Sequence, residues 1–173
     1  MKVTDFLELY RLDGVVQTIA ERLKAKEPHR LQLKGMAGSL DAVMASAVYT
    51  LNPQHQLFVM HDKEEAAYFY TDLKNLLGDQ KEILLFPTSY KRPYSFDDTE
   101  NANILMRAEV LNRLNSKAEK GELIVTYPEA LTEKVINKKS LVENTLGAKV
   151  GAKLDVNFLS EMLAEYGFER TEF

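Results

Sequence analysis

Short apolar runs alternate with helical patterns along most of this 173-residue chain, and this alternation constrains the fold more than any other feature. The runs are rich in branched and aromatic residues and are bounded by polar or turn-forming residues, which is typical of β-strands. Four runs are predicted as strands: residues 31–34, 56–60, 83–86 and 123–126. Because strand, helix and strand repeat in this order, we predict an α/β fold with a parallel sheet and right-handed crossovers.

Helices are predicted between these strands, where apolar residues recur at helical spacing in residues 39–50, 62–77 and 101–114. The second of these segments has Asp62 in the N-cap position and Glu65 three residues later, which is the arrangement of a capping box. Five of its residues share one apolar face: Ala66, Phe69, Tyr70, Leu73 and Leu76. We therefore predict an amphipathic helix that begins directly after Asp62.

The chain divides into three predicted parts. Residues 1–28 form a helical arm, in which Thr4 caps a short first helix and a second helix carries an apolar face. Residues 29–140 form the α/β domain, and a short helix lies near its end. Residues 141–173 begin a small α+β second domain that ends on an extended segment with no visible partner strand. We therefore expect the chain to be a fragment cut inside a larger protein, with a truncated second domain.

The elements expected near the end of the chain are a helix over residues 129–135, a strand over 145–150, a helix over 155–166 and an extended segment over 168–173.

The amino-acid composition limits the functions that these domains can have. The chain has 22 Lys and Arg against 26 Asp and Glu, which argues against a dedicated phosphate-backbone binder. It has no cysteine, which removes thiolate chemistry, disulfides and the usual structural-zinc ligands.

The first ten residues carry no secretory signal pattern, and no apolar stretch approaches the length needed to span a bilayer. We therefore expect a cytoplasmic protein with no membrane partner.

A glycine-containing segment follows the first predicted strand and precedes a helix, which is where a nucleotide-binding fold places its phosphate loop. A working loop has the pattern Gly-x-x-x-x-Gly-Lys-Ser/Thr, in which the last Gly lets backbone amides approach the phosphate, the Lys neutralises it and the hydroxyl holds magnesium. The residues of this segment that we single out are Gly35, Gly38, Ser39, Leu40, Asp41 and Ala42.

The last three of these stand where Gly, Lys and Ser/Thr are required. Asp41 replaces attraction of a polyanion with repulsion, Ala42 offers magnesium no ligand, and Leu40 puts a side chain where the backbone must pass. We therefore predict a degenerate phosphate loop that binds no nucleotide. In the simplest interpretation Gly35 and Gly38 only make a tight strand-to-helix turn, and residual nucleotide binding is the alternative.

Two further groups of residues suggest a function by composition, but a structural role explains each of them more simply. Aromatic and basic residues in 90–96 have the composition of a stacking site for single-stranded nucleic acid, but acidic residues follow in 97–100 and would repel phosphate. The three histidines show no zinc-site spacing, and no serine lies in a nucleophile elbow. We therefore assign no catalytic residue, no metal site and no DNA site, and expect the chain itself to be no enzyme.

Several motifs in matching order resemble the amino-terminal region of bacterial transcription-repair coupling factors. These motifs are the degenerate loop, Leu-Phe-Pro at 85–87 with Arg-Pro-Tyr-Ser-Phe at 92–96, Gly-Glu-Leu-Ile-Val-Thr-Tyr-Pro-Glu-Ala-Leu at 121–131, and Tyr-Gly-Phe-Glu-Arg at 166–170 after a helix. The resemblance spans roughly residues 5–173, which makes it more specific than any single motif.

The resemblance implies a P-loop-type, RecA-like core, similar to domain 1a of the repair protein UvrB, with a degenerate nucleotide site and a small second domain. It implies that the complete protein serves nucleotide excision repair: it displaces stalled RNA polymerase from DNA with an ATP-driven translocase and recruits UvrA. ATP and magnesium belong to motor domains that are absent here, so no cofactor is expected for this chain. The resemblance also implies an intramolecular, autoinhibitory contact with the rest of the protein.

The UvrA-docking surface of the family lies mostly on the second domain and on a strand that would follow Phe173, so it is expected to be incomplete here. Candidate partner contacts are Lys149, Lys153 and Arg170. UvrB has an intact phosphate loop and a long DNA-clamping hairpin, whereas this chain has only the short connection 89–99. The alternative function is a P-loop-derived nucleotide-binding domain or switch with a nonstandard loop, and a DNA-binding module is the weakest candidate.

Overall fold

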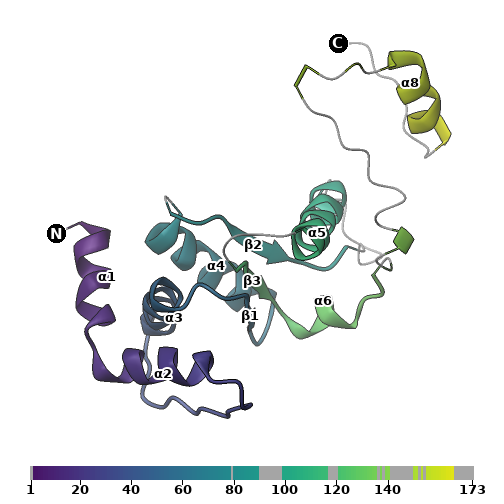
Figure 1. Ribbon diagram of the computed structural model, residues 1–173. Coiled ribbons are helices and arrows are strands. Elements are labelled where there is room, and N and C mark those ends of the chain that lie inside the picture. Colours follow the sequence, from purple (N-terminus) through teal and green to yellow (C-terminus); the bar gives the residue numbers. More distant parts are fainter. Residues whose placement is uncertain are drawn as a thin grey trace. The chain divides into compact units, whose positions relative to one another are not determined.

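A computed structural model describes residues 2–78, 80–89, 99–116, 121–135, 137, 139–140, 150–151, 153 and 155–165. The elements in these ranges (Figure 1) are α1 (Val3–Arg11), α2 (Gly14–Lys24), α3 (Leu40–Leu51), β1 (Gln56–Val59), α4 (Lys63–Leu77), β2 (Ile83–Phe86), α5 (Thr99–Asn115), β3 (Leu123–Thr126), α6 (Pro128–Thr132) and α8 (Val156–Glu165). The predicted mixed α/β class is therefore confirmed. Within the described ranges, no helix has the length and apolar character needed to cross a membrane.

The chain separates into two compact units, Met1–Val135 and Ile136–Phe173. The first unit contains helices α1 to α6 and all three strands, and the second contains α8. In the first unit α1 and α2 pack against α3, where Leu7, Val16 and Val48 are buried. The helices expected as an arm therefore share their packing with the α/β part of the chain.

The sheet has the strand order β1-β3-β2, and both pairs of strands run parallel, as predicted. The register aligns Leu57 of β1 and Leu84 of β2 with Ile124 of the central strand. All four residues of β3 are buried, which is typical of a parallel strand that is covered on both faces. β3 therefore forms the centre of the core.

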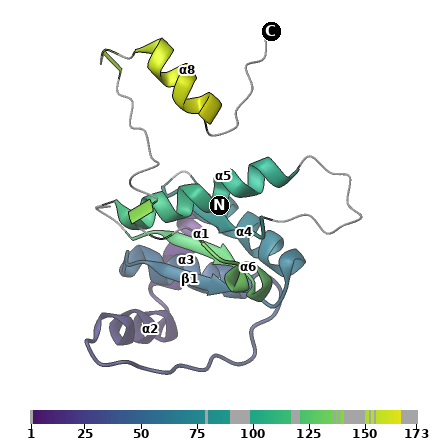
Figure 2. The same cartoon turned by 90° about the vertical axis from the view of Figure 1, so that its right-hand side faces the viewer.

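Helices α4 and α5 cover opposite faces of this sheet. Phe69 of α4 packs against Phe58, with ring centroids 5.0 Å apart, while the guanidinium of Arg107 on α5 lies 4.1 Å from the ring centroid of Phe86. Phe58 and Leu85 occupy the same row of the register, so Phe86, the next residue along β2, points to the other face. Figure 2 shows α3 behind the strands. On the face of the sheet that α5 covers, this helix lies over β2.

Capping explains where two of the helices begin. Asp62 caps α4 as predicted, because its Oδ1 accepts the Glu65 N–H at 2.8 Å, and the Glu65 carboxylate accepts the His61 N–H at 2.8 Å. The hydrogen bond from the Glu65 backbone lowers the pKa of the Asp62 carboxyl. The predicted cap at Thr4 is wrong: α1 begins at Val3 with Lys2 as N-cap, because Asp5 accepts the Lys2 N–H at 3.2 Å.

Residues 31–34 form no strand, so that prediction is wrong. They have no regular secondary structure and are exposed, and the side chains of Leu31 and Leu33 are 47% and 40% exposed. Alternating leucines give this segment the composition of a strand, but strands are stabilised mainly by pairing with a neighbour. Among the described strands β1 forms one edge of the sheet, and residues 31–34 do not pair with it. A RecA-like arrangement, with a strand leading into the phosphate loop, is therefore not present in the described residues.

The remaining expectations have mixed outcomes. The helices predicted over 39–50, 101–114 and 155–166 correspond to α3, α5 and α8. The short helix expected over 129–135 is Pro128–Thr132, so it begins one residue earlier, at a proline that suits the first helical position, and ends three residues sooner. The predicted strand 145–150, except its last residue, and the extended segment 168–173 lie outside the described residues.

Candidate functional site

The segment that the sequence predicts to be a degenerate phosphate loop is exposed and leads through a turn at residues 38–39 into α3. Gly35 and Gly38 have φ values of +82° and +58°, a left-handed conformation that favours glycine. A Cβ built at either position would meet no atom within 4 Å, so the backbone conformation and not the available space requires glycine. Both glycines therefore have a left-handed backbone conformation, and Gly38 lies in a turn directly before α3.

The positive end of the α3 dipole lies beside a negatively charged side chain of the helix itself, that of Asp41. Asp41 Oδ1 accepts the Ala42 N–H at 2.7 Å, and the Val43 N–H donates to the Ser39 carbonyl at 3.1 Å. Ser39 is the N-cap but makes no side-chain capping bond. An aspartate in the first turn interacts favourably with the positive end of the helix dipole. An approaching phosphate would therefore meet a carboxylate and a backbone amide that is already bonded.

The position that should supply a magnesium ligand faces the interior. Ala42 is completely buried in the core together with Val43, whereas Leu40 and Asp41 are half-buried. A hydroxyl at position 42 would lie among apolar side chains and away from any phosphate on the exposed loop. Because of this orientation, the loop differs from a working one in packing as well as in residue type.

An apolar hollow of about 410 Å³ lies beside this turn, between the loop and β1. Leu33 and Met36 line it from the loop side, and Leu57 and Val59 line it from β1. Asp41 is the one charged residue in its lining. A site for a nucleotide phosphate needs cations or free amides, so this hollow suits apolar side chains and not a polyanion.

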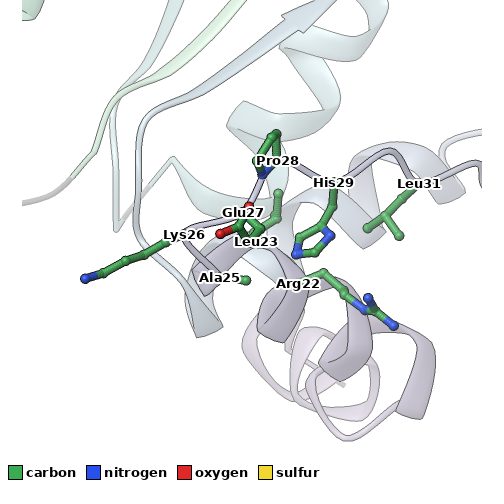
Figure 3. Close-up of a pocket in the computed structure, with 8 residues that line it drawn as sticks. All are labelled: Arg22, Leu23, Ala25, Lys26, Glu27, Pro28, His29 and Leu31. Carbon is green, nitrogen blue, oxygen red and sulfur yellow. The ribbon is translucent and has the colours of Figure 1, made fainter.

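A second hollow, of about 420 Å³, lies at the carboxyl end of α2 (Figure 3). Its lining includes Arg22, Lys26 and His29 together with the single acid Glu27, and Figure 3 shows Lys26 extending away from the other labelled side chains. Cationic side chains are favourable near the negative end of a helix dipole, so their clustering there has a structural cause. Among the residues that the structure describes, no group of His, Asp and Glu is arranged to hold a metal ion.

A buried polar cluster that the sequence analysis missed joins the carboxyl ends of β2 and β3. Arg107 is only 6% exposed, and its Nη1 donates to the carbonyls of Pro87 and Ala130, at 2.7 and 3.1 Å. The same nitrogen lies 2.9 Å from Glu133 Oε2. The Glu133 carboxylate in turn accepts bonds from the N–H and hydroxyl of Ser89. The cluster therefore connects α5 to the segment that follows β2 and to α6 with the residue that follows it.

One signal for this cluster was present in the sequence. Arg107 lies three residues after Ile104 and four before Leu111, so it stands on the apolar side of a predicted helix. A charged residue in that position is buried only when it is paired, which indicates an internal partner but does not identify it. The partner, Glu133, lies 26 positions later and could be found only from the fold.

A second polar cluster holds the amino ends of β1 and β3 together. The Tyr49 hydroxyl donates to the Gly121 carbonyl at 2.9 Å, and the Glu122 N–H donates to His55 Nδ1 at 2.9 Å. Lys81 Nζ and Glu122 Oε2 form a largely buried ion pair, 2.5 Å apart. Burial raises the pKa of the Tyr49 hydroxyl above its ordinary value, and the nearby Glu122 carboxylate raises it further.

Replacing Tyr49 by phenylalanine should reduce the decrease in the free energy of unfolding that occurs as the pH becomes alkaline. Because the pKa of Tyr49 is raised in the folded state, its stabilising contribution is present below the unfolded pKa of about 10 and is lost as the pH rises towards the folded value. Urea unfolding from about pH 8 to about pH 11 should show a smaller decrease for Tyr49→Phe, after a loss of about 1 kcal/mol at neutral pH from the missing hydrogen bond. Tyr68→Phe, at a position 76% exposed, is the control, and an equal slope in all three proteins would contradict the assignment.

The candidate partner contacts are not brought together by the described structure. Lys153 is exposed in the second unit, while Lys149 and Arg170 lie outside the described residues, as do the aromatic residues of 90–96. Asp155 caps α8 by accepting the N–H groups of Asn157 and Phe158, at 3.0 and 3.2 Å. Among its described residues, the second unit supplies α8, shortly after Lys153 in the sequence, and no defined site.

Comparison of the chain with protein-family models, with curated proteins and with solved structures finds no match.

Proposed function

We propose that this chain is a non-catalytic, UvrB-like module of a bacterial transcription-repair coupling factor. The proposal is supported by the four motifs in matching order over roughly residues 5–173, and by the parallel α/β arrangement of the first unit. The module serves in recruitment of UvrA and in autoinhibition, through intramolecular contacts, of the ATP-dependent translocase that removes stalled RNA polymerase. RNA polymerase, DNA, ATP and magnesium are engaged by other domains of that protein.

The observation that carries the non-catalytic assignment is the position of Asp41. Its carboxylate occupies the first turn of α3 and bonds the Ala42 amide, where a nucleotide-binding fold offers free amides and a lysine. Two further observations point in the same direction: Ala42 is buried, and the neighbouring hollow has no cationic lining. A fold with this turn suits an interaction module better than an ATPase.

The decisive experiment is calorimetric titration of ATP with magnesium into the purified chain. We expect no binding heat at millimolar nucleotide, because the site has lost its cation and its hydroxyl and carries a carboxylate instead. UvrB, whose phosphate loop is intact, is the positive control. Asp41→Ala is the matched variant, since it removes the repelling charge without adding a cation.

Saturable, magnesium-dependent binding that persists in Asp41→Ala would overturn this assignment and support the alternative, a nucleotide-binding switch with a nonstandard loop. If no nucleotide binds, UvrA is titrated next, together with a longer chain that extends beyond Phe173. We expect the longer chain to bind UvrA more tightly, because in the family that the chain resembles part of the UvrA-docking surface lies on a strand that would follow Phe173. Equal lack of binding by both chains would remove the UvrA part of the proposal.

A further inference from the structure

Residues 22–34 form the most basic stretch of the chain, which we call the basic segment. They carry five cations and a single acid, and therefore a formal charge of +4, whereas the whole chain carries −4. The residues outside the segment therefore total −8. The five cations are Arg22, Lys24, Lys26, Arg30 and Lys34.

The charges of the basic segment are not neutralised by the residues that the structure describes. None of the five cations takes part in an ion pair there. All residues from 21 to 39 are exposed, so these charges lie in contact with solvent. The dipole of α2 favours cations in its last turn, but its effect weakens beyond that turn and does not explain Arg30 and Lys34. The segment therefore presents unpaired positive charge to a partner.

The hollow of about 420 Å³ at the end of α2 lies within this segment (Figure 3). Its lining combines the cations Arg22 and Lys26 with Leu23 and Leu31, which are 45% and 47% exposed. Pockets that hold an apolar group of a ligand have volumes of roughly 300–1,000 Å³. The hollow is therefore large enough for one large apolar side chain, and positive charges surround it.

Backbone groups of the segment are also free to bind. The Ala25 N–H donates to the Arg22 carbonyl and the Leu40 N–H to the Ala37 carbonyl, at 3.2 and 3.4 Å. Between these two bonds, residues 26–36 make no backbone hydrogen bond to any described residue. Exposed, unpaired backbone can bind an extended peptide through main-chain hydrogen bonds, as the edges of sheets do.

We propose that the basic segment binds an acidic peptide segment of another protein. One apolar side chain of the peptide enters the hollow between Leu23 and Leu31, and the carboxylates of the peptide lie beside the surrounding cations. Opposite charges select this partner and speed its association, because the segment is positive on a chain that is negative elsewhere. The apolar side chain supplies the buried anchor that carries much of the affinity in such interfaces. This inference does not depend on the proposed function.

The same observations favour a peptide over a nucleic acid. A DNA duplex extends well beyond a segment of this length, and the net charge of −8 in the rest of the chain repels its phosphates. Phosphates also offer no apolar group to Leu23 and Leu31, which line the hollow. A short acidic peptide with one large apolar side chain meets neither difficulty.

Binding of a dye-labelled synthetic peptide, followed by fluorescence anisotropy, tests the proposal. The probe has Glu residues on both sides of a single central Trp, and its affinity for the purified chain should fall as the salt concentration rises. Lys26→Glu with Arg30→Glu should weaken binding by about tenfold or more, since like charges then face each other. Lys63→Glu with Lys153→Glu is the control, because it changes the net charge equally at two exposed positions outside the segment and should weaken binding far less.

Two further comparisons test the anchor and the class of partner. A peptide with Ser in place of Trp should bind about tenfold more weakly, because it leaves the hollow without an apolar side chain. Equal binding of the two peptides, or equal binding by the two double variants, would overturn the proposal. So would a lack of binding of the Trp peptide at low salt, or tighter binding of a DNA duplex or of vesicles containing phosphatidylserine through the same cations.

Discussion

Replacing Gly121 by alanine is expected to unfold the first unit or to destabilise it by more than about 4 kcal/mol, a loss that single substitutions rarely reach. A Cβ at this position would lie 1.9 Å from the carbonyl carbon of Gln54 and 2.1 Å from the nitrogen of His55. Both are backbone atoms, so no rotation of a side chain can relieve the collision. The connection before β1 would have to move away from the start of β3.

That movement would break three hydrogen bonds at once. The Gly121 N–H donates to the Pro53 carbonyl at 2.9 Å, the Gly121 carbonyl accepts the Tyr49 hydroxyl, and the following residue, Glu122, donates to His55. These bonds fix the register between β1 and β3 at its first residue pair. Natural domains have a free energy of unfolding of only about 5–15 kcal/mol, so the addition of this single methyl group removes a large part of it.

The measurement is urea unfolding followed by circular dichroism, with Gly14→Ala as the matched control. A Cβ at Gly14 meets no atom within 4 Å, and this residue begins α2, where alanine is favourable. The control should therefore change the unfolding free energy by less than about 1 kcal/mol. Similar stability of Gly121→Ala and Gly14→Ala would show that the connection at residues 53–55 is not held against β3.

Replacing Arg107 by alanine is expected to reduce the free energy of unfolding by about 3–5 kcal/mol, the range for removing one partner of a buried ion pair. The substitution removes the Arg107 guanidinium from its ion pair with the Glu133 carboxylate, whose side chain is 10% exposed. It also leaves the carbonyls of Pro87 and Ala130 without their donor and removes the guanidinium from the face of Phe86.

Two comparisons separate this effect from a general sensitivity to mutation. Arg113→Ala removes a guanidinium that pairs with Glu82 and Glu109 at the surface, and should cost less than about 1 kcal/mol. The double variant Arg107→Met with Glu133→Gln should recover part of the loss, because two uncharged side chains then replace the buried ion pair. A loss for Arg107→Ala no larger than that for Arg113→Ala would exclude the connection described above.

Local sequence signals predicted the elements whose formation depends on nearby residues. The start of α4 followed from Asp62 and Glu65, which satisfy amides within one turn, and the central strand followed from an apolar run between polar residues. The same reasoning placed the glycines of the degenerate loop in a turn, because positive φ is a local property. That Asp41 repels phosphate stays a prediction, and the bond of its carboxylate to the next amide was not foreseen.

Features that depend on distant residues were not predictable in this way. Residues 31–34 have the composition of a strand, but only the strand order shows that no partner lies beside them. The pairing of Arg107 with Glu133 and of Tyr49 with Gly121 joins segments that are remote in sequence. Side-chain composition identifies which residues need a partner, and the fold alone decides which partner they receive.

The strand order β1-β3-β2 has a consequence for folding during synthesis. β1 and β2 do not pair with each other, and the strand that joins them is the last of the three to be made, with Leu123 pairing to Gln56. Until β3 emerges from the ribosome, both earlier strands have unpaired backbones and their helices have no sheet to pack on. Closing such a long loop is slow, so the sheet should form in one late step and not strand by strand.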